Sequence, residues 1–282
     1  MAQTVKSDMR KVFAIFVAVL TLAGCKTGMV WEKMAIDGHR TGVTAPTADN
    51  VAEAIGVVDA RTGVYTAPNG RVFTGGCTPE VATLLINAQP KMAEVKEVIG
   101  FSTKAMVAHA PESELSNMVA DVLREQTAKT VKRRVDFAIT NFGGIRVDMP
   151  EGNVTLDDIR SMFPFVNKIC YVELKGEDLL NLLNQLAETK MQCVSGVKMV
   201  VNNHKLESVE IGGKPLDVKK YYGVATVDFL LDGGDGISVA KNARKLIQTD
   251  EIIGKVMEAY VRKLTAEGKA IEYSTDGRVV VK

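Results

Sequence analysis

The chain has 282 residues, of which 46% are hydrophobic, and it carries 35 basic and 34 acidic side chains. A net charge of +1 excludes the strong basic bias of proteins that bind nucleic-acid polymers. The length allows one large domain or two small ones.

The chain begins with the features of an export signal. Arg10 and Lys11 precede an apolar run over residues 12–20 that is too short to span a membrane. Leu22-Ala23-Gly24-Cys25 then resembles the bacterial lipobox, in which the cysteine is lipidated and becomes the new N-terminus. We therefore predict a signal peptide over 1–24, lipidation at Cys25 and a tether over 25–50. The protein would then be exported and lipid-anchored to the bacterial cell envelope, periplasmic or surface-facing. The alternative is an ordinary signal peptide with a chance cysteine.

Residues 51–110 are interpreted as an N-terminal extension. Short β-rich runs at 55–58, 64–66 and 71–74 predict a small meander, and one strand is also plausible near 30–36. A helix is expected from Thr78-Pro79-Glu80 towards residue 98, broken by Pro90. Beyond Cys25, the irregular spacing of Cys77, Cys170 and Cys193 fits neither a disulfide framework nor a zinc motif, and one disulfide pair stays open.

The spacing of hydrophobic residues predicts helices and strands more clearly after residue 110. An apolar stripe from Leu115 to Leu123 has helical spacing, and Thr155-Leu156-Asp157-Asp158 is a capping-box-like helix start. Further elements are expected as strands at 135–139, 169–174, 197–201, 206–211, 222–227 and 278–281, and as helices at 177–187 and near 250–266. Because several strands are joined by short β–β links, we predict an α+β fold with mixed sheets rather than a doubly wound parallel sheet.

The candidate site starts from Thr140-Asn141-Phe142-Gly143-Gly144-Ile145-Arg146, which follows a predicted buried strand. Two glycines let a backbone approach a ligand closely, and an arginine fork binds phosphate. Taken alone, Gly-Gly after a strand is more often a plain turn. Phe165 and Phe229 are expected in loops, where an aromatic side chain usually serves packing. Asp235 lies between glycines, where an aspartate usually belongs to a turn. Together these residues offer two rings for a base, a carboxylate for a ribose and a cation for a phosphate.

From about residue 112 to 282 the chain resembles the C-terminal, substrate-binding domain of the 5′-nucleotidase / UDP-sugar hydrolase family. The resemblance rests on five stretches in the same order: residues 112–121, 141–146, 164–167, 194–196 and 228–236. It implies a four-layer α/β/β/α domain over 111–282 that clamps a nucleotide between two phenylalanines. The implied roles are base stacking by Phe165 and Phe229, ribose binding by Asp235, base-pocket lining by Asn167 and Gly196, and phosphate contact by Arg146 and Asn141.

The sequence departs from the family pattern at three places. Phe142 stands where the family usually has glycine, and Val166 replaces the glycine of Pro-Phe-Gly-Asn. Ala110-Pro111 stands where a second phosphate-binding arginine is common. We expect phosphate binding to be weaker or differently shaped as a result.

In the family, the chemistry belongs to an N-terminal metallophosphoesterase domain with two metal ions. This chain has three scattered histidines, His39, His109 and His204, without metal-ligand spacing. We therefore expect no catalytic residues, metal site or cofactor in this chain, and divalent metals on a separate metallophosphoesterase chain. Its function would be the nucleotide-binding half of a 5′-nucleotidase-type hydrolase in nucleotide catabolism. The alternative is a non-catalytic nucleotide- or nucleoside-binding lipoprotein.

Overall fold

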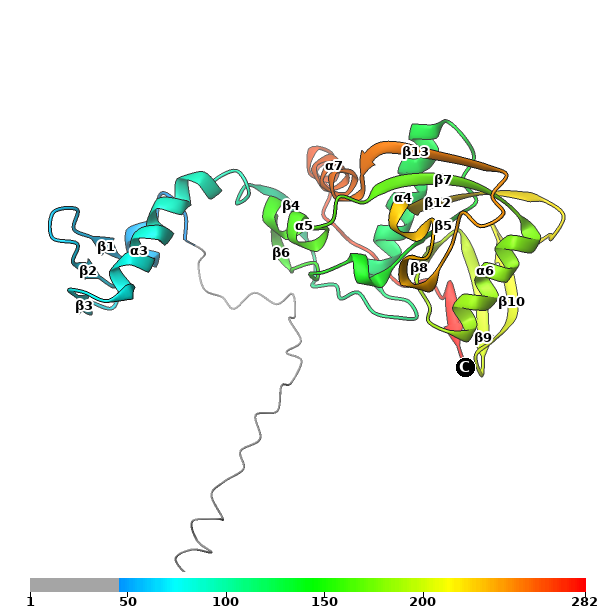
Figure 1. The fold of residues 1–282 in the computed structure, drawn as a ribbon, viewed down its shortest axis with the longest axis horizontal. Helices are drawn as coiled ribbons and strands as arrows, with labels where there is room; N and C mark the ends of the chain where they lie inside the picture. The colour runs from blue at the N-terminus through cyan, green and yellow to red at the C-terminus, as the bar shows by residue number, and fades with distance from the viewer. Residues whose placement is uncertain (1–45) are drawn as a thin grey trace, which may run out of the picture. The chain divides into compact units, whose positions relative to one another are not determined.

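The computed structural model describes residues 46–282 (Figure 1). The predicted signal peptide, Cys25, the strand near 30–36 and most of the tether lie outside the described residues. In the described part, no helix has the length and hydrophobicity needed to cross a membrane.

The predicted meander in the N-terminal extension is confirmed. After a short helix, α2 (Val51–Ala54), three two-residue strands pair in antiparallel fashion: β1 (Val57–Val58), β2 (Tyr65–Thr66) and β3 (Val72–Phe73). Helix α3 (Cys77–Ala88) follows and tightens into the 3-10 turn η1 (Gln89–Met92). The expected helix therefore ends well before residue 98, since Pro90 lacks the N–H that would continue it.

Strand β4 (Val98–Ser102) was not expected from the sequence pattern. It pairs in antiparallel fashion with β6 (Gly152–Thr155) and contacts helix α7 (Ile253–Ala266). Strand β4 therefore packs on elements from far along the chain.

The central sheet has five strands in the order β13-β7-β12-β5-β8. Its strands are β5 (Phe137–Thr140), β7 (Lys168–Lys175), β8 (Cys193–Ser195), β12 (Tyr221–Val227) and β13 (Lys245–Ile252). Strands β5 and β12 are parallel and the other neighbours antiparallel, so the sheet is mixed. Strands β8 and β13 were not expected. The helix predicted from about residue 250 begins only at Ile253, because the residues before it alternate in burial as a strand does.

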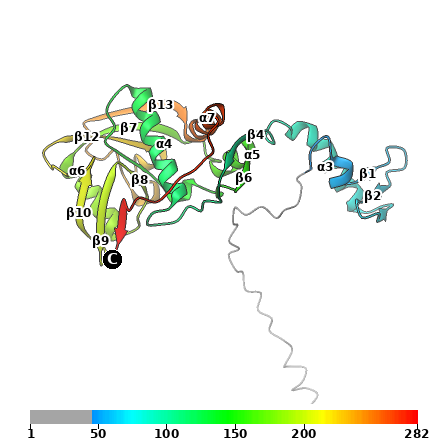
Figure 2. The ribbon, with the colours of Figure 1, turned by 180° about the vertical axis from the view of Figure 1, so that it is seen from behind.

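Helix α4 (Glu114–Val131) lies across this sheet, as Figure 2 shows from behind. Its predicted apolar stripe is buried, and Ser113 caps its first turn together with Ser116. The predicted capping box of α5 (Leu156–Met162) is also confirmed. There the Asp158 N–H donates to Thr155 Oγ1 at 3.3 Å, and the Thr155 N–H donates to Asp158 Oδ2 at 2.7 Å.

A second mixed sheet has the order β11-β10-β9-β14. Its strands are β9 (Val197–Asn202), β10 (Lys205–Ile211), β11 (Lys214–Pro215) and β14 (Val279–Val281), with β14 parallel to β9. Helix α6 (Gly176–Glu188) turns its buried leucines inward and contacts strands of both sheets. The expected α+β class with mixed sheets is confirmed.

The motif at 112–121 holds the C-terminal segment of the chain in place. Arg278 is buried and donates to both carboxylate oxygens of Asp121, at 2.8 and 3.1 Å. Tyr273 donates to the same carboxylate at 2.9 Å. Glu112 accepts from the backbone N–H of Asp276 at 2.8 Å. We call these residues the C-terminal clamp. They fasten the segment that ends in β14, which is a structural role.

Candidate functional site

Four loops meet at one end of the five-stranded sheet, which we call the site edge. They are residues 141–146 after β5, 163–167 before β7, 190–192 before β8, and 228–236 after β12. The strand registers force this meeting: Val227 pairs with Ile169, and Thr140 pairs with Cys193. Helix α7 also starts here, where the Ile253 N–H donates to the Asn167 carbonyl at 3.0 Å. Ligands commonly bind beyond the strand ends of open sheets, and the site edge is such a place.

The glycine loop positions Asn141. Residues Phe142–Gly144 form a 3-10 turn, and neither Gly143 nor Gly144 has a left-handed backbone. Glycine is required at 144 for space instead, because a Cβ there would lie 2.9 Å from Asn141 Oδ1. Neither glycine therefore serves a left-handed turn, and Gly144 lets the Asn141 side chain pack closely against the loop.

Asn141 links two of the loops. Its side chain is buried, and its Nδ2 donates to Asp235 Oδ2 at 2.8 Å. Asp235 itself has a left-handed backbone, with φ 51°, inside the Gly-Gly-Asp-Gly turn. Within the described part of the chain, Asn141 Oδ1 has no hydrogen-bond partner. A buried acceptor of this kind costs free energy unless a ligand or water completes it.

The two phenylalanines are not core residues. The Phe165 side chain is 47% exposed and the Phe229 side chain 45% exposed, so packing alone does not account for them. Phe165 belongs to a narrow pocket at the site edge that Asn141, Asn167 and Val227 also line. Both residues are therefore half-exposed at the site edge.

Arg146 brings positive charge to the same place. Its guanidinium carbon lies 6.0 Å from the centre of the Phe165 ring, and its Nη1 donates to the Gly143 carbonyl at 3.4 Å. The side chain is exposed and makes no ion pair within residues 46–282. The guanidinium is available to an anion.

Gly196 does not join this group. It lies after β8, at the other end of the sheet, where a Cβ would come within 2.1 Å of the Asp136 carbonyl. Its φ of 77° serves the turn between β8 and β9. The structure thus gives Gly196 a structural role and places it apart from Asn141 and Phe165.

Sequence reasoning missed two glutamines at the site edge. Gln192 Oε1 accepts from the Phe142 N–H at 3.1 Å, so Phe142 ties the glycine loop to the segment before β8. Gln185 Nε2 donates to the Gly236 carbonyl at 2.7 Å and holds the loop that carries Asp235. No spacing in the sequence indicated either residue, because both act through contacts distant in the chain.

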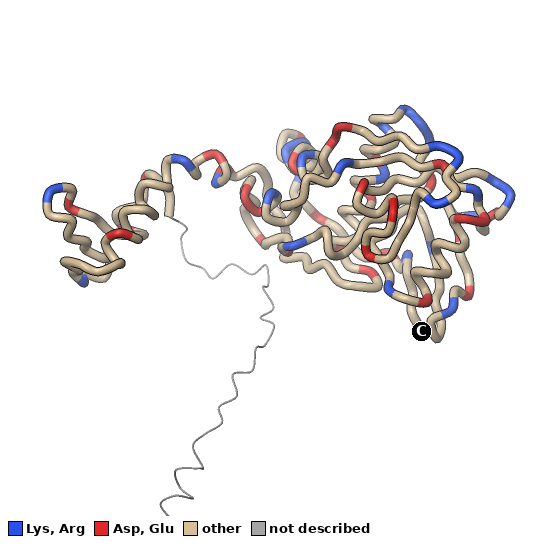
Figure 3. Tube along the Cα trace, viewed as in Figure 1, with Lys and Arg blue, Asp and Glu red and all other residues tan. Residues whose placement is uncertain are grey.

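The electrostatics of the site edge are mixed. Asp228, Asp232 and Asp235 make the loop after β12 acidic, as the red segments in Figure 3 show. Burial, with the nearby Asp228 charge, raises the pKa of the Cys170 thiol to about 12. Cys170 is therefore protonated at neutral pH and is not a nucleophile. Among the described residues, no three His, Cys, Asp or Glu side chains lie close enough to hold a metal ion.

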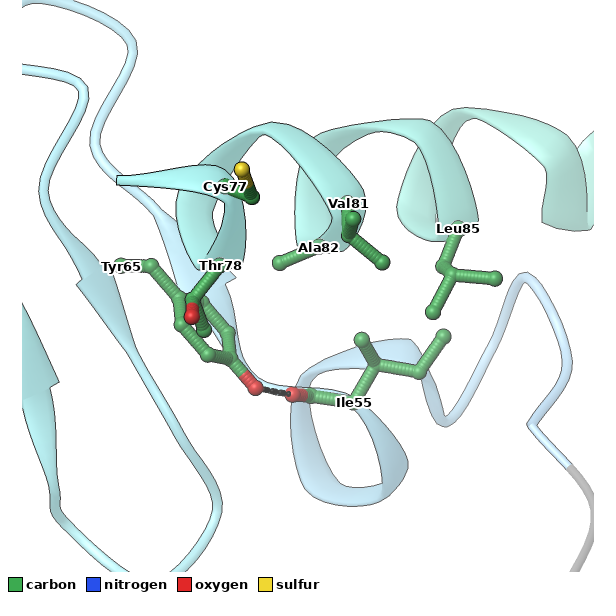
Figure 4. Close-up of a pocket in the computed structure, with 7 residues that line it drawn as sticks. All are labelled: Ile55, Tyr65, Cys77, Thr78, Val81, Ala82 and Leu85. Atoms are coloured by element: carbon green, nitrogen blue, oxygen red, sulfur yellow. Dashed lines mark hydrogen bonds between the residues drawn. The ribbon is translucent and has the colours of Figure 1, made fainter. Parts of the chain in front are cut away.

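A second pocket lies in the N-terminal extension, away from the glycine loop. It is lined by the helix α3 residues Val81, Ala82 and Leu85, with Tyr65 and Ile55 opposite (Figure 4). Tyr65 donates to the Ile55 carbonyl at 2.5 Å. The lining is apolar and holds none of the predicted site residues. Cys77 at its rim is free, as are the buried Cys170 and Cys193, so no disulfide forms among residues 46–282.

The family model for the 5′-nucleotidase C-terminal domain matches residues 92–242. Cell wall protein Lmo0130 of Listeria monocytogenes is 29% identical over 288 residues, which cover 90% of this chain and 36% of that protein. Protein UshA of Escherichia coli is 29% identical over 153 residues, covering 52% of this chain and 27% of UshA. The chain thus spans about a third of the length of the curated relatives it matches.

Solved structures give the same result. A 5′-nucleotidase precursor from Thermus thermophilus matches with a TM-score of 0.63 and 27% identity, covering 72% of this chain and 43% of that one. The NAD nucleotidase of Haemophilus influenzae matches with a TM-score of 0.55 and 20% identity, covering 74% of this chain and 42% of that one. It shares the fold. The expected four-layer α/β/β/α architecture is confirmed by these likenesses.

Proposed function

Because this chain belongs to the 5′-nucleotidase C-terminal domain family, we propose that it binds a nucleotide at the site edge. The base stacks on Phe165 and Phe229, Asp235 holds the ribose, and Arg146 with Asn141 meets the phosphate end. The observation that carries this proposal is the meeting of two half-exposed phenylalanines, a carboxylate and an arginine without an ion pair in residues 46–282 on four converging loops.

The contacts at the site edge support these roles. The Asn141–Asp235 hydrogen bond leaves the second Asp235 oxygen to accept from a ribose hydroxyl. Asn141 Oδ1, which is buried without a partner in the described part, would accept from a ligand donor. Arg146 provides one guanidinium for phosphate. At Ala110-Pro111, where relatives commonly carry a second arginine, the chain has no cation, so phosphate contributes less to affinity.

The same proposal assigns hydrolysis to a partner. We propose that this chain is the substrate-binding half of a 5′-nucleotidase-type hydrolase and that a separate metallophosphoesterase chain supplies the catalytic domain. Two bound metal ions there would activate water and stabilise the leaving oxygen. The scarcity of histidine supports this division, since His39, His109 and His204 are far apart in the sequence. The chain's own residues would hold the base and ribose and present the phosphate.

Binding is tested by titration calorimetry with nucleoside monophosphates. Base–aromatic stacking is worth about 1–3 kcal/mol per base, so Phe165→Ala and Phe229→Ala should each weaken binding roughly tenfold and barely change the thermal midpoint. Phe101→Ala is the matched control, because Phe101 is 51% exposed and lies on β4. Equal affinity for all four proteins would eliminate the stacking site.

The division of labour is tested by phosphate release. The chain alone should release no phosphate from nucleotides with Mn²⁺, Zn²⁺ or Mg²⁺, and a matching metallophosphoesterase chain should restore turnover. Arg146→Ala should then lower that turnover. If nucleotides bind but no metallophosphoesterase chain gives turnover, the non-catalytic binding protein is the correct function. Metal-dependent hydrolysis by this chain alone would overturn the proposal.

A further inference from the structure

The end of the five-stranded sheet opposite the site edge gathers positive charge. Arg134 lies three residues after the end of α4, and its carbonyl lies against Gly223 of β12. Lys175 at the end of β7 pairs with Tyr221, the first residue of β12. Arg244, just before β13, stacks its guanidinium 4.6 Å from the centre of the Tyr221 ring. We call this surface the basic edge; its cations are Lys132, Arg133, Arg134, Lys175, Lys219, Lys220, Arg244 and Lys245 (blue in Figure 3).

The basic edge carries an excess of charge that its own ion pairs do not remove. Four cations have a carboxylate partner, in the pairs Arg134–Asp136, Lys175–Glu177, Lys220–Asp217 and Arg244–Glu173. The other four, Lys132, Arg133, Lys219 and Lys245, make no ion pair within residues 46–282. Asp178 also lies near Lys175, so three positive charges are left in excess on one edge of a chain whose formal net charge is only +1.

Apolar side chains lie among these cations. Tyr221 is 48% exposed, Val218 41% and Leu246 45%. A tyrosine with one apolar and one polar end is favoured at the headgroup level of a bilayer, and lysine or arginine stems extend along apolar surface while their charges reach phosphate. A nucleic-acid backbone would satisfy the charges but offers nothing to the exposed valine and leucine.

We propose that the basic edge docks on an anionic phospholipid surface. Each lysine or arginine near such a surface contributes about 1 kcal/mol of attraction. Strand β7 has eight residues and separates the two ends of the sheet by about 26 Å. Docking through the basic edge would therefore leave the site edge facing away from the lipid and open to solutes. The inference does not depend on what binds at the site edge.

The test uses the full chain carrying Cys25→Ser, so that no lipid anchor masks the effect. Co-sedimentation compares vesicles of phosphatidylcholine with vesicles in which phosphatidylglycerol replaces about a third of it. A variant with Lys132, Arg133, Lys219 and Lys245 all changed to Gln removes only cations that have no ion-pair partner within residues 46–282. The matched control changes four exposed lysines on or near the second sheet to Gln: Lys198, Lys205, Lys214 and Lys282.

We expect the parent and the matched control to bind phosphatidylglycerol vesicles, and the basic-edge variant to bind at least about tenfold more weakly. Added salt should release the parent, because exposed charges are screened. Equal binding of the variant and the control would overturn the proposal. So would equal binding of the parent to both kinds of vesicle. Binding of double-stranded DNA without binding of phosphatidylglycerol would assign the basic edge to a polyanion instead.

Discussion

At the scale of single residues, the absence of a side chain at Gly144 leaves room for the Asn141 side chain in the candidate site. A methyl group at this position would lie 2.9 Å from Asn141 Oδ1, closer than carbon and oxygen pack without moving apart. The Asn141 side chain lies between the glycine loop and Asp235, so any displacement at Gly144 passes to the hydrogen bond that joins two loops.

Gly144→Ala should therefore weaken nucleotide binding. Loss of a hydrogen bond to a charged group costs about 1.5–3 kcal/mol, or roughly tenfold to a hundredfold in affinity. Titration calorimetry measures this change, and a thermal melt should show only a small loss of stability. Gly75→Ala is the control, because a Cβ there meets nothing within 4 Å. Unchanged affinity in Gly144→Ala would remove Asn141 from the binding site.

At the scale of elements, the C-terminal clamp joins helix α4 to the last strand of the second sheet. The Arg278 side chain is only 9% exposed and that of Asp121 17%. Removing one partner of a buried ion pair leaves an uncompensated charge, which typically costs about 3–5 kcal/mol. The clamp therefore contributes much more to the free energy of unfolding than an exposed ion pair on the same helix does.

Asp121→Asn should lower the free energy of unfolding by several kcal/mol, measured by urea denaturation. Glu125→Gln is the matched control, one turn further along α4. Glu125 pairs with Lys129, and both side chains are more than 60% exposed. Exposed pairs contribute at most about 1 kcal/mol. Comparable losses in the two variants would show that the clamp does not hold the C-terminal segment.

At the scale of the whole molecule, ion-paired carboxylates make stability depend on pH. The hydrogen bonds from Arg262 hold the pKa of Glu97 below its ordinary value, and those from Arg278 do the same for Asp276. The unfolded chain, with carboxyl pKa values of about 4, takes up protons first as the pH falls. These groups therefore stabilise the fold fully above about pH 5 and lose that contribution below it.

Urea unfolding between pH 7 and pH 3 should accordingly give a nearly constant free energy down to about pH 5 and a steady fall below it. Arg262→Gln should flatten part of this fall, because the Glu97 pKa then returns towards its ordinary value. A free energy of unfolding that rises on acidification would contradict the assignment of these carboxylates.

The anchoring of the molecule is a separate prediction. If Cys25 is lipidated, Cys25→Ser should leave the protein unprocessed or released, because the acyl chains supply the membrane affinity. Fractionation of cells at high salt checks this, since salt also removes any attraction through the basic edge. Membrane fractionation identical to that of the parent would rule out the lipobox interpretation. The Cys77→Ser variant is the control for loss of a thiol.

Much of the fold could be predicted from the sequence because its signals are local. The stripe of α4, the leucine face of α6 and the Thr155 capping box each depend on residues within a few positions of one another. Strands β7, β9, β10 and β12 were located to within a residue or two for the same reason. Strands β4, β8 and β13 were missed, because they are short or mixed in polarity and exist through their partners.

For the candidate site, the sequence by itself determined the chemical groups: Asn141, Arg146, Phe165, Phe229 and Asp235 lie in loops where the pattern placed them. Only the tertiary structure decided which of them meet. Parallel β5 and β12, with β7 antiparallel between β12 and β13, bring these loops to one edge and send Gly196 to the other. Strand order is set by contacts between residues far apart in the chain, and no local spacing encodes it. The same long-range pairing turned the motif at 112–121 into the C-terminal clamp.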